Sequence, residues 1–328
     1  MKFVTFQYDN NSEPRFGFKK DDQIIDIVYA SDWFHQSEND SRFLDIPSSL
    51  KEALGDWTAN FEKIMELDMA LSNHDLLSVS EGEFQVATLE TNVRLLPPVT
   101  NPRSFRDFYA FEQHVRSARK LRGLDMHPDW FKIPIFYFSN PVALYGDKAE
   151  IPYPIGTDEL DFELEFAIII ANGGSNISID NAKNFIGGYT ICNDWSARDL
   201  QREEMAMNLG PAKGKDFATS FGPYMVTPDE LENDWDENGK LHLRMTCHVN
   251  GKLISDGNTN DLYHSFGKMI ERASMNTKLL PGDYFGSGTV GTGCILELRP
   301  ENTGGWIKKG DVVKMEIEKM GILENKIV

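Results

Sequence analysis

The sequence predicts a strand-rich α+β fold in which a small β-rich N-terminal domain precedes a larger second domain. Its 328 residues are enough for about two domains of ordinary size. Three prolines in LLPPVTNP, residues 95–102, mark the best boundary, because proline ends regular structure on both sides of itself. Beyond this segment, strand-like runs outnumber helical ones. We therefore expect domains over residues 1–97 and 98–328.

The first domain is expected to combine strands with a helix. The runs KFVTFQY and QIIDIV, residues 2–8 and 23–28, are short and alternating or apolar, and a turn-rich segment separates them. Large apolar side chains then recur at helical spacing between Trp57 and Leu71. No part of this region combines histidine, carboxylates and glycine in a pattern that indicates chemistry, so we expect an accessory domain.

The second domain is expected to consist mainly of strands, without internal repeats or heptads. Asn250-Gly251 is a hairpin signal between LHLRMTCHV and KLIS, residues 252–255, because both residues accept the backbone of a tight turn. The strand-like runs are DFELEFAIII (161–170), GGYTICND (187–194), GPYMV (222–226), LHLRMTCHV (241–249), CILEL (294–298) and VVKMEI (312–317).

Charge and composition exclude several classes of partner. The 33 basic and 51 acidic side chains leave a net charge of −18, which repels nucleic acids and anionic membranes. The longest apolar stretch, Phe166 to Ala171, is far shorter than the roughly 20 residues of a membrane span. The N-terminus does not resemble a secretory signal, and we expect a cytoplasmic protein. A site for an organic acid would need locally fixed positive charge.

The cysteines and two glycine-rich motifs point to no particular chemistry. Cys192, Cys247 and Cys294 form no C-x-x-C pair, which argues against disulfides and a thiolate zinc site and predicts buried thiols. GSGTVG at 286–291 matches a dinucleotide motif, but the run after it looks like a strand instead of the required helix. GPAKGKD at 210–216 lacks the spacing of a phosphate loop.

Two carboxylates in the run 161–170 could share one cation. Glu163 and Glu165 lie on the same side of a strand, because side chains alternate with a period of two. A solvated acidic face is the simpler explanation of this segment alone. The run that follows is continuously apolar, however, which indicates burial, and a buried acid pair is costly unless a cation lies between its members.

Further segments supply groups that would suit such a site. Asp107 and His114 are seven residues apart and would share a face if the segment is helical. Asp194 ends a predicted strand, and Ser196 could cap the helix that follows. Each of these residues also has a purely structural explanation: Asp107 could cap a helix, Asp194 could be a turn residue, and His114 could be a buried histidine. Arg198 and Gln201 would share a helix face, and a glycine-rich loop carries Lys213 and Lys215.

Five segments, in this order, resemble the fumarylacetoacetate hydrolase family over about residues 100–300. The most specific are NDWSARD and the histidine segment. The segments are D-F-Y-x-x-x-Q-H (107–114), E-x-E (163–165), N-D-W-S-A-R-D-x-Q (193–201), G-K-x-F (214–217) and G-T-V-G-T-G-C-I-L-E (288–297).

The resemblance implies a mixed β-sandwich roll, usually homodimeric, with one divalent cation in the active site. Oxygen ligands suit Mg²⁺ or Mn²⁺, and also Ca²⁺, better than zinc. Carried over by motif, the metal ligands are Asp107, Glu163, Glu165 and Asp194; the catalytic base is His114, oriented by Glu297; and the substrate-binding residues are Tyr109, Arg198, Gln201, Lys215 and Thr289.

The resemblance also implies the type of reaction. The leading hypothesis is a hydrolase that cleaves a carbon–carbon bond of a 1,3-diketo acid, such as an acylpyruvate, as in the catabolism of aromatic compounds. Relatives that decarboxylate oxaloacetate-like acids or dehydrate sugar acids make a lyase the alternative, and a scaffold that has lost activity is a third. REEM at 202–205 departs from the family by lacking a substrate-contacting tyrosine at 205, so fumarylacetoacetate itself is not the expected substrate.

A second departure concerns the segment after the histidine. The family has an arginine there, and Arg119, Lys120 and Arg122 are equally good counterparts for it. The charged segment 117–130 that contains them could form a lid over the site.

Overall fold

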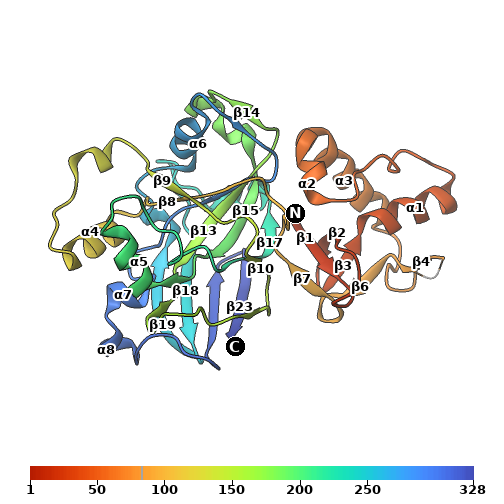
Figure 1. Ribbon diagram of the computed structural model, residues 1–328. Helices are drawn as coiled ribbons and strands as arrows, with labels where there is room; N and C mark the ends of the chain where they lie inside the picture. The colour runs from red at the N-terminus through yellow and green to blue at the C-terminus, as the bar shows by residue number, and fades with distance from the viewer. Residues whose placement is uncertain (83) are drawn as a thin grey trace.

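The computed structural model describes residues 1–82 and 84–328, and two β-sheets dominate its larger part (Figure 1). One sheet has the strand order β6-β3-β2-β1-β17-β15-β13-β21-β8-β9, with β10 beside β17 and β7 beside β1. The other has the order β11-β23-β22-β18-β19. The predicted strand-rich α+β class is confirmed.

The centre of the first sheet contains several strands that the sequence predicts. The continuously apolar run from Phe166 onward is fully buried within β13, as expected for a strand covered on both faces. From β1 to the far edge, the strands are β1 (Lys2–Gln7), β17 (Thr219–Val226), β15 (Ile186–Asn193), β13 (Leu164–Ile170), β21 (Tyr284–Gly286), β8 (Phe105–Phe108) and β9 (Phe136–Ser139), with β10 (Leu144–Tyr145) pairing with β17.

The second sheet contains the predicted hairpin. Asn250 and Gly251, at φ 50° and 80°, form the turn between β18 and β19, and both take the left-handed backbone that this turn requires. The strands are β11 (Glu150–Ile151), β23 (Gly321–Ile327), β22 (Val312–Ile317), β18 (Arg244–Val249) and β19 (Lys252–Asn258).

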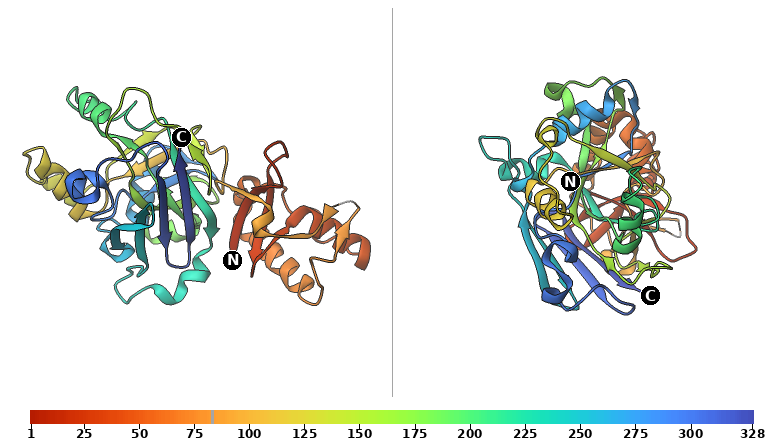
Figure 2. Two further views of the ribbon diagram at one scale, coloured as in Figure 1. Left: turned by 90° about the horizontal axis from the view of Figure 1, so that it is seen from below. Right: turned by 60° about the vertical axis from the view of Figure 1, so that its left-hand side comes forward.

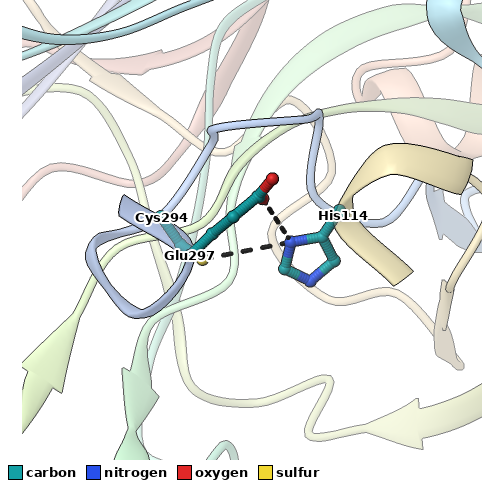
Figure 3. Close-up of side chains that lie close together, drawn as sticks. All are labelled: His114, Cys294 and Glu297. Carbon is teal, nitrogen blue, oxygen red and sulfur yellow. Dashed lines mark hydrogen bonds and ion pairs between the residues drawn. The ribbon is translucent and has the colours of Figure 1, made fainter. Parts of the chain in front are cut away.

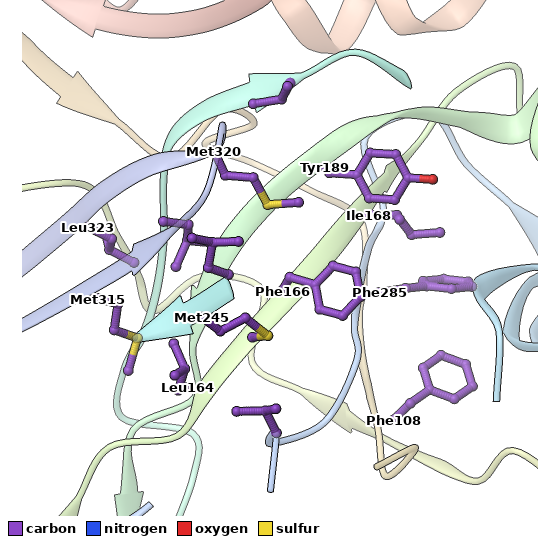
Figure 4. Close-up of a cluster of buried hydrophobic side chains, with 14 of the residues drawn as sticks. Phe108, Leu164, Phe166, Ile168, Tyr189, Met245, Phe285, Met315, Met320 and Leu323 are labelled. Carbon is purple, nitrogen blue, oxygen red and sulfur yellow. The ribbon is translucent and has the colours of Figure 1, made fainter. Parts of the chain in front are cut away.

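The main hydrophobic core lies between the two sheets. Phe166 and Ile168 of β13 belong to one buried cluster with Met245 of β18 and Met315 of β22 (Figure 4). Alternate residues of β13 point the other way, into a second core that the N-terminal helices cover. β13 is therefore fixed on both faces, which gives the carboxylates at its start a rigid support.

Most strands of the N-terminal part extend the first sheet, and only β4 and β5 of the described residues form a small separate pair there (Figures 1 and 2). β1 pairs with β17, so the sheet runs across the predicted boundary, and the division at residue 97 stays a prediction. The predicted helix over 57–71 is confirmed. The elements are β2 (Arg15–Lys20), β3 (Gln23–Asp26), α1 (Ile27–Glu38), α2 (Leu50–Ala53), α3 (Trp57–Leu71), β4 (Ser80–Glu81), β5 (Phe84–Gln85), β6 (Ala87–Leu89) and β7 (Arg94–Leu96).

Two expectations for this part are wrong. The segment expected to be a turn contains strand β2. The strand expected over 23–28 ends at Asp26, because the Asp26 carboxylate accepts hydrogen bonds from the backbone N–H groups of Val28 and Tyr29 and starts helix α1 there.

The strand expected over 294–298 is also wrong, because residues Ile295–Leu298 form the short helix α7. The N–H groups of Ile295 and Leu296 donate to the buried Asp161 carboxylate, at 2.8 and 3.0 Å, and this fixes the start of the helix. The glycine-rich run 286–291 thus does precede a helix. A carboxylate of the chain itself already occupies the helix N-terminus where a phosphate would bind.

The expected cap at Ser196 is wrong as well. Its hydroxyl donates to the Asp194 carbonyl, and helix α5 begins after Ala197 without a side-chain cap. The remaining helices and strands are α4 (Glu112–Leu121), α5 (Arg198–Met205), α6 (Phe266–Ser274), α8 (Pro300–Thr303), β12 (Leu160–Asp161), β14 (Gly174–Ser175), β16 (Ser196–Ala197) and β20 (Lys278–Leu279), and the 3₁₀ helices are η1 (Leu54–Asp56), η2 (Glu90–Asn92), η3 (Pro128–Phe131), η4 (Ile179–Phe185), η5 (Pro228–Asp234) and η6 (Thr259–Asp261).

Among the described residues, no helix combines the length and the apolar character that crossing a bilayer requires. All three cysteines are buried and unpaired, as predicted.

Candidate functional site

Four carboxylates meet at one end of the central strands. Asp107 lies on β8, Glu165 on β13, Glu163 just before β13, and Asp194 just after β15. All four are buried, and each offers an oxygen within 4.8 Å of those of the others. β13 pairs with both β15 and β21, and β21 pairs with β8, so the strand order itself brings these side chains together.

Asp107 reaches this cluster from a strand, which corrects the expectation that it shares a helix with His114. In register, Asp107 pairs with Gly286 of β21 and with Tyr137 of β9. These strand pairings hold residues 105–108 extended, and helix α4 begins only at Glu112. Asp107 and His114 therefore approach the site from two different elements.

Gly286 makes the close approach of two carboxylates feasible. A Cβ atom at this position would lie 2.4 Å from Asp107 Oδ1 and 3.0 Å from Glu165 Oε2. Such distances are too short for any side chain without movement of both carboxylates. β21 lies between β13, which carries Glu165, and β8, which carries Asp107. The glycine on β21 therefore lets the two carboxylates meet across it.

Lys215 brings positive charge directly to two of the four carboxylates. Lys215 donates to Glu163 Oε2 at 2.5 Å and to Asp194 Oδ2 at 2.6 Å. Burial disfavours the charged form of Glu163, but Lys215, with Arg198, outweighs this and lowers its pKa to about 2. The pKa of Lys215 itself is raised, because burial is more than offset by the Asp194 and Glu163 charges.

Asp107 and Glu165, on the opposite side of the cluster, form no ion pair with a basic side chain of the described residues. Burial and then the charge of Asp194 raise the pKa of Asp107 well above its usual range, and burial and Asp107 do the same for Glu165. In the part of the chain that the structure describes, Asp107 Oδ1 is buried without a hydrogen-bond partner. These carboxylates are hard oxygen donors, and such donors fit a divalent cation of the Mg²⁺ or Mn²⁺ type.

His114 of α4 forms a pair with Glu297 of α7 (Figure 3). Its Nδ1 lies 3.0 Å from Glu297 Oε2. Burial disfavours the charged form of Glu297, yet the hydrogen bond and charge of His114 lower its pKa. The charge of His114 also acts on Glu163, which places the pair next to the carboxylate cluster. The arrangement predicted for His114 and Glu297 is present.

Arg198 is fixed by three neighbours. Its Nε donates to Asp161 Oδ2 at 2.8 Å, and its Nη1 lies 3.0 Å from Gln201 Oε1 and 2.8 Å from Glu163 Oε1. Its buried Nη2 has no partner among the described residues. Arg198 and Gln201 thus share a helix face, as the spacing predicts, and Nη2 is left as an unused donor.

The remaining predicted substrate residues border the same region. The Tyr109 ring meets the His114 ring edge to face, with centroids 5.6 Å apart. Burial raises the pKa of Tyr109 to about 12, and the charge of Arg122 opposes this shift. Among Arg119, Lys120 and Arg122, the three candidates for the family's arginine, Arg122 is thus the one that acts on Tyr109. Thr289 Oγ1 lies 3.4 Å from Glu165 Oε1, so it contacts a candidate ligand.

Sequence reasoning missed two residues of the site. Tyr137 donates from its hydroxyl to Asp194 Oδ2 at 2.6 Å, and only the pairing of β8 with β9 places it there. Asp161 joins Arg198 to the start of α7, the helix that carries Glu297. Asp161 could have been found, because it precedes Glu163 and Glu165 in the same two-residue alternation.

Comparison with known sequences agrees with this site. The profile described as fumarylacetoacetate (FAA) hydrolase C-terminal matches residues 103–328. This chain belongs to the fumarylacetoacetate hydrolase family. The family profile thus covers all the site residues described above.

Relatives of known name span much or all of the chain. The chain is 28% identical to the mitochondrial oxaloacetate tautomerase fahd2 of Xenopus laevis, over 100% of this chain and 90% of the relative. It is 30% identical to the human mitochondrial oxaloacetate tautomerase FAHD2A over 60% of each protein.

Solved structures show the same fold. A maleylpyruvate hydrolase from Sphingobium sp. SYK-6, in complex with manganese(II) and pyruvate, superposes with a TM-score of 0.68 at 21% identity, covering 100% of this chain and 99% of that one. The fumarylacetoacetate hydrolase of Exiguobacterium antarcticum has a TM-score of 0.68 at 23% identity over the same shares of the chains. At this identity the likeness establishes the fold, which is that of the family.

Proposed function

We propose that this protein is a metal-dependent hydrolase that cleaves a carbon–carbon bond in a 1,3-diketo acid of the acylpyruvate type. The observation that carries the proposal is the His114–Glu297 pair beside a buried cluster of carboxylates. An activated water molecule needs a base of this kind, and cation-assisted chemistry needs oxygen ligands of this kind. The relation to a maleylpyruvate hydrolase crystallised with manganese(II) and pyruvate supports the substrate class.

Asp107, Glu163, Glu165 and Asp194 would hold the divalent cation. When bound, the cation supplies positive charge that orients the keto acid and favours its enolate. Lys215 and Tyr137 hold two of the ligands: Lys215 contacts Glu163 and Asp194, and Tyr137 contacts Asp194. The hydrogen bonds of Lys215 thus go to the ligands, so we assign it to holding the cluster and not to direct contact with substrate.

His114 takes the proton from water. Glu297 accepts a hydrogen bond from Nδ1–H, which leaves the lone pair of His114 on Nε2. Water that loses a proton to Nε2 attacks the carbonyl distal to the carboxylate, and the adjacent carbon–carbon bond breaks. The products are a carboxylic acid and a 2-keto acid, and the proton held by His114 returns to the carbon that leaves. Arg198 Nη2 stabilises the negative charge on the attacked oxygen.

Isotopic labelling tests this reaction directly. A panel of acylpyruvates is incubated with the protein and Mg²⁺ or Mn²⁺ in H₂¹⁸O, and the products are analysed by mass spectrometry. We expect ¹⁸O in the carboxylic acid product and loss of turnover on chelation of the metal. Cleavage without ¹⁸O in that acid would exclude hydrolysis and favour a lyase.

A second candidate is the interconversion of the keto and enol forms of oxaloacetate. The relatives named oxaloacetate tautomerases favour it, one of them aligned over the whole chain. This reaction needs a proton acceptor and a cation but no attacking water, so His114 could serve it. Catalysed loss of the enol absorbance of oxaloacetate, with no cleavage of any acylpyruvate, would favour the tautomerase over the hydrolase.

A further inference from the structure

A second group of metal-ligating side chains lies behind the proposed base. His114 Nδ1 is 3.0 Å from Glu297 Oε2 and 4.0 Å from Cys294 Sγ, and one ligand atom from each residue lies within 4.8 Å of the others. Figure 3 shows the sulfur and the carboxylate on the same side of the imidazole ring, with the other ring nitrogen directed away from both. The proposed hydrolysis makes no use of Cys294.

We propose that His114, Cys294 and Glu297 form a second metal site that binds Zn²⁺ and thereby inhibits the enzyme. The inhibition rests on the proposed function of His114 as a base, whereas the binding does not. One nitrogen, one sulfur and one oxygen ligand make a set typical of zinc, with a fourth position left for water. The oxygen-only cluster selects harder ions, so the two sites prefer different metals.

The distances require only small movements. Tetrahedral zinc with ordinary bond lengths puts a nitrogen and an oxygen ligand about 3.3 Å apart and a nitrogen and a sulfur ligand about 3.5 Å apart. The observed separations are 3.0 Å for His114 Nδ1 to Glu297 Oε2 and 4.0 Å for His114 Nδ1 to Cys294 Sγ. Cys294 and Glu297 lie three residues apart at the start of helix α7, so rotation of their side chains can supply the difference.

Charge balance also favours zinc here. Burial keeps the pKa of the Cys294 thiol well above its usual range, so the cysteine stays protonated and unreactive without metal. Zinc binding displaces this proton to solvent, because a coordinating thiol is deprotonated. One thiolate and one carboxylate then neutralise the two charges of the ion, which suits a buried site. The sequence lacks a C-x-x-C pair, but this site needs only one thiolate.

Zinc at Nδ1 would remove the base. With Glu297 as its partner, His114 carries its proton on Nδ1 and its lone pair on Nε2. An imidazole bound to metal through Nδ1 carries its proton on Nε2 instead. His114 could then no longer accept a proton from water, even with the carboxylate cluster loaded with Mg²⁺.

Cobalt spectroscopy tests the site without reference to turnover. The full-length protein, saturated with Mg²⁺, is titrated with Co²⁺, and we expect the near-ultraviolet charge-transfer band that a thiolate–cobalt bond produces. Cys294→Ala should abolish the band, and Cys247→Ala, which removes another buried cysteine, should retain it. Absence of the band from the wild-type protein, or its persistence in Cys294→Ala, would overturn the proposal.

Zinc titration then tests the inhibition. We expect Zn²⁺ to displace cobalt and to lower the hydrolytic rate by about 10²-fold or more, the usual contribution of a general base. Cys294→Ala should keep the Mg²⁺-dependent rate and lose most of the inhibition. A cobalt band on a protein that cleaves no diketo acid would support the metal site and overturn the proposed function. If zinc lowers hydrolysis equally in the wild type and in Cys294→Ala, the proposed function would stand and the zinc site would be overturned.

Discussion

His114 combines the features that general-base catalysis at neutral pH requires. Its pairing with Glu297 fixes the ring and the tautomer, and both side chains are about 5% exposed, so water does not compete for their hydrogen bond. Arg198 is equally constrained, by Asp161, Gln201 and Glu163. The residues proposed to move protons and to stabilise charge are therefore held in place before substrate arrives.

The role of His114 can be tested by removing its base. His114→Asn should lower kcat by about 10²- to 10⁴-fold, since this is what a positioned base contributes. Mn²⁺ affinity should stay close to that of the wild type, because His114 is not among the oxygen ligands. Steady-state kinetics and calorimetry measure the two quantities. The exposed Arg116 of the same helix provides the control, Arg116→Ala, and an unchanged kcat in His114→Asn would remove the assignment.

Gly286 gives a second test at the level of one residue. In Gly286→Ala the new methyl group would meet Asp107 Oδ1 and Glu165 Oε2 and force them apart. We expect Mn²⁺ to bind at least about 10-fold more weakly, the smallest loss usual for disturbance around a metal site. Gly55→Ala, where a Cβ meets nothing within 4 Å, is the matched control. Equal Mn²⁺ affinity in both variants would show that the glycine does not shape the site.

At the level of elements, strand order accounts for the site. The order β15-β13-β21-β8 brings four carboxylates from three segments to one end of the sheet. The two-residue alternation predicted that Glu163 and Glu165 act together, and the strand-like runs predicted β13, β15, β17, β18 and β22. Pairing between distant strands, such as β8 with β21, is set by long-range contacts that no local pattern contains. For this reason Asp107 was placed on a helix and Tyr137 was missed.

The helices show the same limit. Local spacing predicted that Arg198 and Gln201 share a face, and the structure agrees. The run 294–298 has the composition of a strand but forms helix α7, because the distant Asp161 accepts its first N–H groups. The family resemblance supplied His114 with Glu297, which lie 183 positions apart in the chain, and residue spacing alone could not have paired them.

A buried histidine links the segment after α4 to the body of the protein and predicts a pH effect. His264 Nε2 donates to the Trp130 carbonyl at 2.6 Å, and Nδ1 is buried without a partner among the described residues. Burial lowers the pKa of His264. The hydrogen bond to Trp130 acts to raise this pKa, and the charge of Lys268 acts to lower it further. The unfolded chain therefore binds the proton more readily, and the free energy of unfolding should fall as the pH drops below about 6.5.

Denaturant unfolding at about pH 7.5 and about pH 5.5 measures this effect across the ordinary histidine pKa. His264→Gln keeps a donor for the Trp130 carbonyl but cannot take up a proton, so its loss of stability between the two pH values should be smaller than that of the wild type. His242→Gln, at an exposed histidine, should behave like the wild type. The same loss in all three proteins would contradict the assignment to His264.

At the scale of the whole molecule, the site brings two basic side chains into a strongly acidic protein. The chain carries a net charge of −18, and its buried carboxylate cluster adds to the local negative charge. Lys215 and Arg198 are buried directly against the cluster, where they act at short range. A divalent cation would complete the local positive charge that an anionic substrate needs. The sheet that carries the site continues through β1 into the N-terminal part, so this part also supports β17.

Binding of Mn²⁺ measured by titration calorimetry tests the central claim most directly. The wild-type protein should bind one Mn²⁺ per chain at the carboxylate cluster. Glu165→Gln removes one ligand charge. It should weaken Mn²⁺ binding more than loss of a residue that only contacts the ligands, which costs about 10- to 100-fold. His114→Asn should bind Mn²⁺ as the wild type does. Failure of the wild type to bind Mn²⁺, or equal binding by Glu165→Gln, would contradict a metal centre at this cluster.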